Sequence, residues 1–198
     1  MYPTREAALF ELEQAGQLNP GPWTAHCLHP AQAAEGIAAR WGRNPDQAFV
    51  CGVLHDLGRR TGICATRHML DGYAYMMEKG WDEVARICLT HSFPLQDAAA
   101  NLGKKDITPE QDRFLTEYIR QVTYDAYDKL IILCDSLADA NGFCLLEKRF
   151  VDTTRRYGVF PFTVERWNRT FAIKEEFEQR IGCSLYTLLP GIENCLYT

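Results

Sequence analysis

CGVLHDLGRR, residues 51–60, places an adjacent histidine and aspartate at the end of an apolar stretch. The preceding residues 49–54, FVCGVL, are apolar, and His55 and Asp56 follow them directly, before a leucine, a glycine and two arginines. Burying a charged side chain costs free energy unless a partner group or a metal ion stabilises it. We therefore expect a partner or a metal opposite His55 and Asp56.

The size and charge of the chain narrow the kinds of protein it can be. A chain of 198 residues is long enough for one domain with a substantial core, and we expect residues 1–198 to form a single domain. The formal net charge of -5 predicts no basic patch for duplex nucleic acid. Neither a membrane-spanning apolar run nor a signal-peptide core is found. We expect a cytoplasmic protein, and a homo-oligomer is compatible with the sequence.

The eight cysteines are spread singly through apolar segments, without a Cys-x-x-Cys pair. This distribution favours reduced thiols that are buried as small hydrophobic side chains over a framework of disulfides. Cys27 and Cys134 fall close to the candidate site discussed below, but the pattern gives neither of them a nucleophilic role.

Apolar residues recur with the period of a helix along most of the chain, which predicts an all-α fold, a single compact helical bundle with additional C-terminal helices. Asn44 fits an N-cap with Pro45 in the first helical position, and Thr108 with Gln111 fits a capping box. The tail over residues 184–198 is ambiguous, either packed irregularly or a contact surface. Glycines are expected to end several helices: Gly16, Gly42, Gly80, Gly142, Gly158 and Gly182. The predicted helices cover residues 4–15, 23–41, 45–56, 67–79, 82–92, 109–121, 126–138, 145–157 and 163–181.

Two polar residues fall on the inward side of predicted helices. His91 continues the apolar stripe of the helix over residues 82–92, so we expect it to face the core. Asp135 lies beside the apolar seam of the helix over residues 126–138, one turn beyond an inward isoleucine. The sequence therefore directs an imidazole and a carboxylate towards the interior.

The remaining histidines also lie close to apolar stripes. His68 is flanked by apolar positions and lies one turn before Gly72, where the missing side chain predicts room for a ligand. His26 borders the apolar stripe of the helix over residues 23–41, and His29 lies one turn further on. Only one of these two is needed at a site, and the spacing to the following apolar residues favours His26.

Each of these residues has an ordinary explanation when taken alone, as a hydrogen-bonded core histidine or a helix-terminal aspartate. Four inward histidines and two aspartates are much harder to bury together without a shared ligand. Imidazole and carboxylate donors suit zinc, iron, manganese or nickel. Six such donors exceed the needs of one structural zinc, and with Asp56 as a bridge they suffice for two metal ions that activate a water molecule.

Several stretches resemble the HD-domain superfamily of metal-dependent phosphohydrolases, whose signature is a histidine, a His-Asp pair and a distal aspartate, all on helices. The resemblance covers about residues 22–140, which we take as an HD-like core, and leaves about residues 141–198 as a C-terminal helical extension. The stretches are HCLHPAQAAEGIAARWG (26–42), VLHDLGRR (53–60), RHMLDGY (67–73), LTHSF (89–93) and YDKLIILCD (127–135).

The resemblance implies a set of metal ligands and a subgroup. The most similar pattern is that of the bacterial HD-type hydrolases that cleave diadenosine tetraphosphate symmetrically, which share the order of ligands and a lysine six residues before the last aspartate, here Lys129. Arg59 stands where a lysine is common, and residues 91–94, HSFP, differ from the loop of that subgroup. The implied ligands are His26, His55, Asp56, His68, His91 and Asp135.

We predict an HD-type phosphohydrolase that uses two divalent ions, of iron, manganese, nickel or zinc, on a small phosphorylated metabolite such as a nucleotide. Asp56, Arg59 and Lys129 are the expected catalytic residues. Arg59, Arg60, Arg67 and Lys129 are the cations nearest in sequence to the ligands, and we expect them to bind phosphate. Two alternatives stay open: an HD-type mixed-valence di-iron oxygenase, and a non-catalytic metal-binding regulatory module.

Overall fold

Amphipathic helices make up most of the chain, and the computed structural model describes residues 1–196. The prediction of an all-α fold is confirmed. Short 3-10 helices cover Leu57–Thr61 (η1), Ala98–Ala100 (η2), Leu185–Leu188 (η3) and Ile192–Leu196 (η4). The helices are α1 (Arg5–Leu18), α2 (Trp23–Trp41), α3 (Pro45–Leu54), α4 (Arg67–Glu78), α5 (Asp82–Thr90), α6 (Pro109–Gln121), α7 (Ala126–Ser136), α8 (Leu146–Tyr157) and α9 (Thr163–Ile181).

Local capping signals decide where several of these helices begin and end. The Asn44 side chain accepts hydrogen bonds from the amides of residues 46 and 47, and the capping box of Thr108 and Gln111 is formed. Gly42 and Gly182 end α2 and α9 in the left-handed conformation, with φ of 75° and 72°. Such ends satisfy carbonyl and amide groups that the helix leaves unpaired.

Two of the glycines expected to end helices do not do so. Gly16 lies inside α1, which runs on to Leu18, because a glycine in the last turn weakens a helix without ending it. The helix expected to reach residue 138 stops at Ser136, because the chain turns there into a two-residue hairpin. Its strands, β1 (Ala138–Asp139) and β2 (Gly142–Phe143), are antiparallel, and Gly142, with φ of 148°, is part of this hairpin rather than a helix stop.

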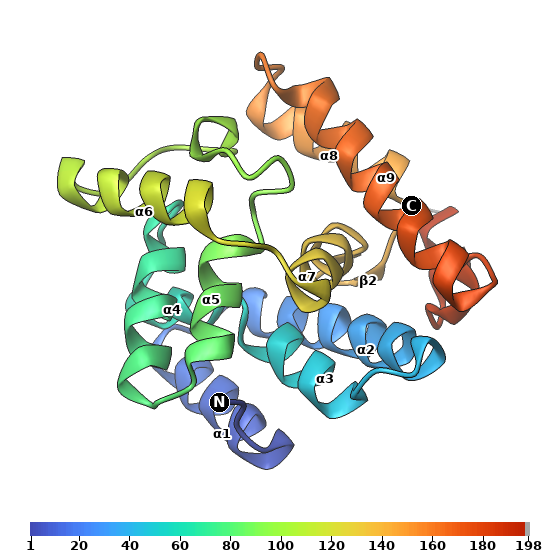
Figure 1. Ribbon diagram of the computed structural model, residues 1–198, viewed down its shortest axis with the longest axis horizontal. Coiled ribbons are helices and arrows are strands. Elements are labelled where there is room, and N and C mark those ends of the chain that lie inside the picture. Colours follow the sequence, from blue (N-terminus) through green and yellow to red (C-terminus); the bar gives the residue numbers. More distant parts are fainter. Residues whose placement is uncertain (197–198) are drawn as a thin grey trace.

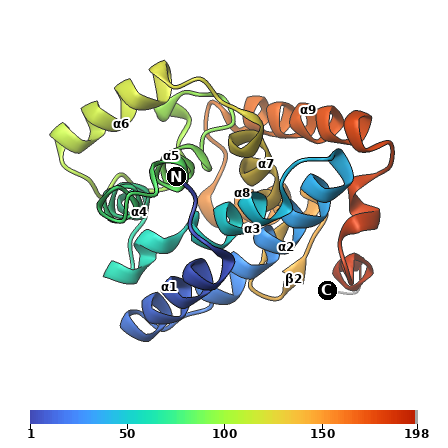
Figure 2. The same ribbon diagram turned by 60° about the horizontal axis from the view of Figure 1, so that its bottom comes forward.

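Helix α7 lies in the middle of the molecule, between the N-terminal helices and the C-terminal pair α8 and α9 (Figures 1 and 2). The largest group of buried apolar side chains joins α2, α3 and α7 to α9 and η3, and it includes Ile37, Leu130 and Phe177. The C-terminal helices therefore share a core with the HD-like part. This shared core supports the proposal that the chain forms a single domain. Residues 197 and 198 lie outside the part of the chain that the structure describes.

A second buried group joins α1, α2, α3 and α5, and a close approach of two backbones brings α4 against η1. A Cβ atom on Gly58 would lie 1.9 Å from the carbonyl oxygen of His68 and 2.5 Å from the amide nitrogen of Gly72. Gly72 in turn faces Gly58 and the side chain of Cys88. The space expected to hold a ligand beside Gly72 is therefore filled by protein, and that prediction is wrong.

The helices of residues 1–196 include none with both the length and the apolar character required to cross a bilayer. All eight cysteines are free thiols, and five of them are buried.

Candidate metal centre

The end of α3 allows His55 and Asp56 to face the same space. Adjacent residues on a regular helix point about 100° apart. The helix ends at Leu54, and Asp56 adopts a non-helical conformation with φ of -105° and ψ of 11°. As a result, Nε2 of His55 lies 3.9 Å from Oδ2 of Asp56. Both residues are buried, His55 completely.

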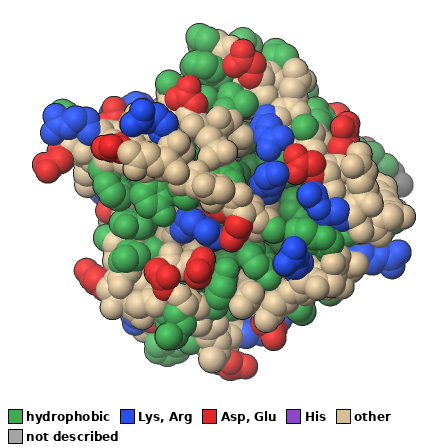
Figure 3. Space-filling view, viewed as in Figure 1, with side chains coloured by type: hydrophobic (Ala, Val, Ile, Leu, Met, Phe, Trp, Pro, Cys, Tyr) green, Lys and Arg blue, Asp and Glu red, His purple; other side chains and the backbone are tan. Residues whose placement is uncertain are grey.

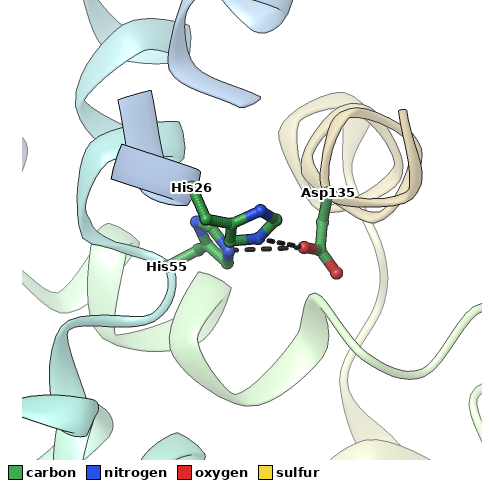
Figure 4. Close-up of side chains that lie close together, drawn as sticks. All are labelled: His26, His55 and Asp135. Carbon is green, nitrogen blue, oxygen red and sulfur yellow. Dashed lines mark hydrogen bonds and ion pairs between the residues drawn. The ribbon is translucent and has the colours of Figure 1, made fainter. Parts of the chain in front are cut away.

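One group of donors joins α2, the end of α3 and α7. Oδ1 of Asp135 lies 2.8 Å from Nε2 of His26 and 3.6 Å from Nε2 of His55. Figure 4 shows the two imidazoles, from separate helices, converging on this single oxygen. These three side chains offer ligand atoms that all lie within 4.8 Å of one another, a spacing that one metal ion can bridge.

A second group of donors lies around Asp56. Its Oδ1 atom is 3.0 Å from Nε2 of His68, on α4, and 3.6 Å from Nε2 of His91, at the end of α5. The two Nε2 atoms of these histidines are 3.5 Å apart. His55, Asp56 and His91 form a group whose ligand atoms all lie within 4.8 Å. His55 thus belongs to both groups and connects them.

Backbone carbonyls orient three of the imidazoles. Nδ1 of His55 bonds to the carbonyl of Gly52 at 2.7 Å, and Nδ1 of His91 bonds to that of Cys88 at 3.0 Å. His68 bonds to the carbonyl of Ala65 in the same way. Each Nδ1 therefore carries the proton, and each Nε2 keeps its lone pair for the centre, which is how histidine ligands are commonly held.

Buried polar atoms without partners indicate that the cluster fits a metal. Within residues 1–196, Nε2 of His55 and Oδ1 of Asp56 are buried and make no hydrogen bond of acceptable geometry. Unpaired buried groups of this kind carry a large desolvation cost. A divalent ion accepts both imidazole nitrogen and carboxylate oxygen. The two donor groups therefore fit a divalent ion.

The electrostatics of the cluster keep its carboxylates ionised. Burial by itself would raise the pKa of Asp56, but Arg59, His68 and His55 hold it well below its usual range. Burial likewise opposes ionisation of Asp135, yet His26 and His55 hold its pKa well below the usual range. Ionised carboxylates are the form that binds metal ions. The two carboxylates are therefore ionised at neutral pH and available to bind cations.

Two cavities meet at the cluster. The first cavity, of about 810 Å³, is lined by His26 and Asp56. The second cavity, of about 520 Å³, is lined by His68 and by Arg166 of α9. Both volumes lie in the range of small-molecule sites. Residues common to the two linings are Arg59, His91, Ser92, Asp135, Arg149, Arg156 and Tyr157.

Of the four cations predicted to bind phosphate, the structure brings only Arg59 to the cluster. Its Nε donates to Oδ2 of Asp56 at 2.6 Å, and its side chain lines both cavities. Arg60 lies over the ring of Tyr75, 3.9 Å from its centroid, and Arg67 pairs with Asp71 at 3.3 Å. Neither Arg60 nor Arg67 is among the described residues that line the two cavities.

Lys129 is also placed elsewhere, although it was expected to be catalytic and to bind phosphate. Its Nζ atom donates to Glu176 of α9 at 2.8 Å. Six residues along a helix turn by about 600°, so Lys129 and Asp135 lie on different faces of α7. The prediction from sequence proximity is therefore corrected by the helical geometry.

His29, the competing first ligand, is turned away from the cluster. Its Nδ1 atom lies 2.9 Å from the carbonyl oxygen of Asp139, and its ring packs on Phe143. Figure 3 shows Lys and Arg side chains on the face of the molecule that carries α9. The structure thus brings His26, not His29, to Asp135.

The arginines of α8 and α9 that line the two cavities were not predicted from the sequence. Arg149, Arg155 and Arg156 of α8 line the first cavity, and Arg166 of α9 lines the second. These residues follow Asp135 by many positions and belong to no recognised motif. The only signal in the sequence is the concentration of arginine in the stretch RRY, residues 155–157.

Comparison with known families assigns the fold and site to a class. The HD domain family model matches residues 24–138, more than half of the chain. The chain therefore belongs to the HD domain family, whose members are generally metal-dependent hydrolases. The subgroup that cleaves diadenosine tetraphosphate stays a prediction. Neither the curated proteins nor the solved structures gave a match to this chain.

Proposed function

We propose that this chain is a metal-dependent phosphohydrolase that cleaves a phosphate ester or anhydride in a small phosphorylated metabolite, such as a nucleotide, at a binuclear centre. The proposal also places it in the cytoplasm. The observation that carries the proposal is that five of the six donors, all except the fully buried His55, line one or both of two cavities whose linings also include arginines of α8 and α9. A purely structural metal site would instead be closed.

Access to the centre supports an enzyme over a regulatory module. The side chains of His26 and Asp135 are 13% and 26% exposed, whereas His55 is fully buried. Solvent and substrate can therefore approach from the side of Asp135. This arrangement leaves room for coordination by a water molecule and a substrate oxygen.

The mechanism assigns separate tasks to the residues of the site. Divalent ions held by the six donors would supply Lewis acidity and a water molecule of lowered pKa. Asp56 supplies a buried anion between the histidines, and Arg59 fixes one of its oxygens. Arg149 and Arg156 line both cavities and offer charged donors to the phosphoryl oxygens of a bound substrate.

Two cavities that share residues of one centre favour a substrate that occupies both of them. The second cavity includes the aromatic side chains of Phe150 and Trp167, and the first includes Trp23. Aromatic walls suit nucleobases, and arginines suit the phosphates between them. These features support the finer proposal that dinucleoside polyphosphates are substrates.

The proposal is tested by metal analysis of the purified protein, followed by assays of dinucleoside polyphosphates, mononucleotides and phosphomonoesters with each candidate metal, with and without oxygen. We expect about two equivalents of metal and hydrolysis that does not need oxygen. Turnover that requires oxygen, with a di-iron spectroscopic signal, would establish the oxygenase instead. A metal-loaded protein inactive on every substrate would contradict both.

Replacement of Asp56 by alanine should abolish hydrolysis and metal retention, because this carboxylate contacts the histidines of both donor groups. Asp71→Asn is the matched control, since Asp71 lies nearby on α4 but pairs with Thr61 and Arg67. Metal content and hydrolysis rate are measured on both variants. Full activity in Asp56→Ala would remove the proposed centre.

A further inference from the structure

Arg166 lies on α9, outside the residues that match the HD domain family, and its side chain reaches the second cavity. Its Nη1 atom donates to the carbonyl oxygen of Ser92 at 3.0 Å and to that of Ala100 at 2.7 Å. Both N–H groups of Nη1 are thereby used, because this nitrogen carries only two. The plane of the guanidinium is therefore fixed relative to the segment that follows His91.

The other edge of the guanidinium has no protein partner. Within residues 1–196, neither Nε nor Nη2 of Arg166 donates a hydrogen bond to another residue. These two nitrogens form the edge that binds a carboxylate or a phosphate through two parallel hydrogen bonds. The residue is thus held by one side while its anion-binding side is available to the cavity.

The charge of Arg166 is also uncompensated. Within the described residues no carboxylate forms an ion pair with it, and Asp135 acts on it only from a longer distance. Burial lowers its pKa to about 10, so the group remains a cation at neutral pH. Even a half-buried cation without a counter-charge is costly. An anion entering the second cavity would offset that cost.

The second cavity connects this cation to the centre. Its lining includes Arg166 together with His68, His91 and Asp135. An anionic group held at Arg166 therefore shares one space with the cluster. The stacked rings of Phe150 and Trp167, 5.6 Å apart and nearly parallel, form part of the same wall.

We propose that Arg166 is a substrate-binding residue that holds a phosphate group of the substrate through its Nε and Nη2 edge. The inference rests on the proposed function and narrows it, because a substrate must then carry phosphate within reach of α9 as well as at the centre. Arg166 lies beyond residue 138, so this contact belongs to the C-terminal extension of this chain.

The test is a calorimetric titration of inorganic phosphate into the full-length, metal-loaded protein. Arg166→Met removes the charge while keeping a long side chain, and Arg166→Lys keeps a charge without the forked edge. The control is Arg169→Ala, on the same helix, where Arg169 pairs with Glu176 at 3.2 Å. We expect Kd to rise about tenfold or more in Arg166→Met, less in Arg166→Lys, and not at all in Arg169→Ala.

Metal content and Tm are measured on every variant. An unchanged Kd in Arg166→Met at normal metal content would overturn the inference, and so would a wild-type protein that binds no phosphate. If Arg166→Met does not fold, Arg166→Lys decides, and its Kd must still rise. Phosphate binding that depends on Arg166 without any hydrolysis leaves this inference standing and removes the proposed function. Hydrolysis whose KM is unchanged in Arg166→Met would remove this inference and leave the proposed function standing.

Discussion

The single free nitrogen on each imidazole determines what the cluster can hold. His55, His68 and His91 each use Nδ1 on a backbone carbonyl and turn Nε2 towards a carboxylate. Because the carbonyls belong to the same local turns as the histidines, this orientation is built into the helix ends. The carboxylates of Asp56 and Asp135, in contrast, are donors that are not held by such a turn.

Replacement of Asp135 by asparagine should weaken metal binding by at least about tenfold, because the neutral amide no longer supplies an anion between His26 and His55. The measurement is metal content after dialysis against a competing chelator. His29→Gln is the control, since His29 lies on the same helix as His26 but contacts the carbonyl of Asp139. Equal metal retention in Asp135→Asn and wild type would exclude Asp135 as a ligand.

Glu11 makes stability depend on pH at a site remote from the cluster. Burial opposes ionisation of this carboxyl group, but hydrogen bonds from Lys79 and Tyr75, both at 2.6 Å, lower its pKa below the ordinary value of 4.5. A carboxyl group whose pKa is lower in the folded state stabilises the fold above pH 4.5. That contribution is lost as the pH falls through the folded-state pKa.

Glu11→Gln should therefore lower the free energy of unfolding by about 1–3 kcal/mol at pH 7. The difference from wild type should shrink between pH 7 and pH 3, as the falling pH begins to protonate Glu11 of the wild type. Denaturant unfolding at both pH values measures this. Glu13→Gln, at an exposed position on the same helix, should change stability little at either pH, and a pH-independent loss in Glu11→Gln would contradict the electrostatic explanation.

Among the elements, η1 and α4 are held at an unusually short distance by two glycines. Gly58→Ala would place a Cβ atom 1.9 Å from the carbonyl oxygen of His68, so the two backbones must separate. We expect a loss of about 1–3 kcal/mol or more in the free energy of unfolding, together with weaker metal binding, because Asp56 and His68 lie on the two separated elements.

Gly36→Ala is the matched control for that variant. Gly36 lies inside α2, and a Cβ atom there would meet no atom within 4 Å. It should stabilise the protein by about 0.4–1 kcal/mol, since alanine restricts the unfolded chain and favours the helix. Thermal or denaturant unfolding of the two variants compares them directly. Similar stability in both would show that the short approach at Gly58 is not required.

The helices also show which features the sequence could reveal. The caps at Asn44 and Thr108 were predicted because each depends on residues within one turn. The space at Gly72 was misinterpreted because it is filled by Gly58, fourteen positions earlier in the sequence, and no local pattern reports that contact. Lys129 was misplaced for a related reason: closeness in sequence does not fix the face of a helix.

For the molecule as a whole, the C-terminal helices are part of the main core. Phe177 of α9 is 1% exposed and packs edge-on against Trp41 of α2, with ring centroids 5.4 Å apart. Phe177→Ala should lower the free energy of unfolding by about 3–5 kcal/mol. Val164→Ala, on an exposed position of α9, should cost much less.

Denaturant unfolding followed by fluorescence and by circular dichroism tests this prediction and the single-domain proposal together. Coincident transitions by both probes, shifted together in Phe177→Ala, are expected if α9 unfolds with the rest of the chain. A separate early transition confined to the variant would instead assign α8 and α9 to an independent unit.

The fold class and the donor cluster were both readable from the sequence, because helical periodicity places His91 and Asp135 on inward faces. The cavities could not be predicted from the sequence, because the arginines of α8 and α9 that line them are far from the donors in the sequence. Arg166 follows Asp135 by thirty-one positions and comes to line the second cavity through the packing of α9 on α7. Such a contact is set by tertiary structure alone.

The donors and the arginines contributed by α8 and α9 occupy separate stretches of the chain. The side chains proposed as metal ligands come from residues 26–135, whereas the arginines of α8 and α9 that line the cavities come from residues 149–166. Substitutions in the second stretch can therefore change which molecules fit the cavities without altering the proposed metal ligands. A mutant library confined to α8 and the first half of α9 is accordingly the natural place to seek altered selectivity by directed evolution.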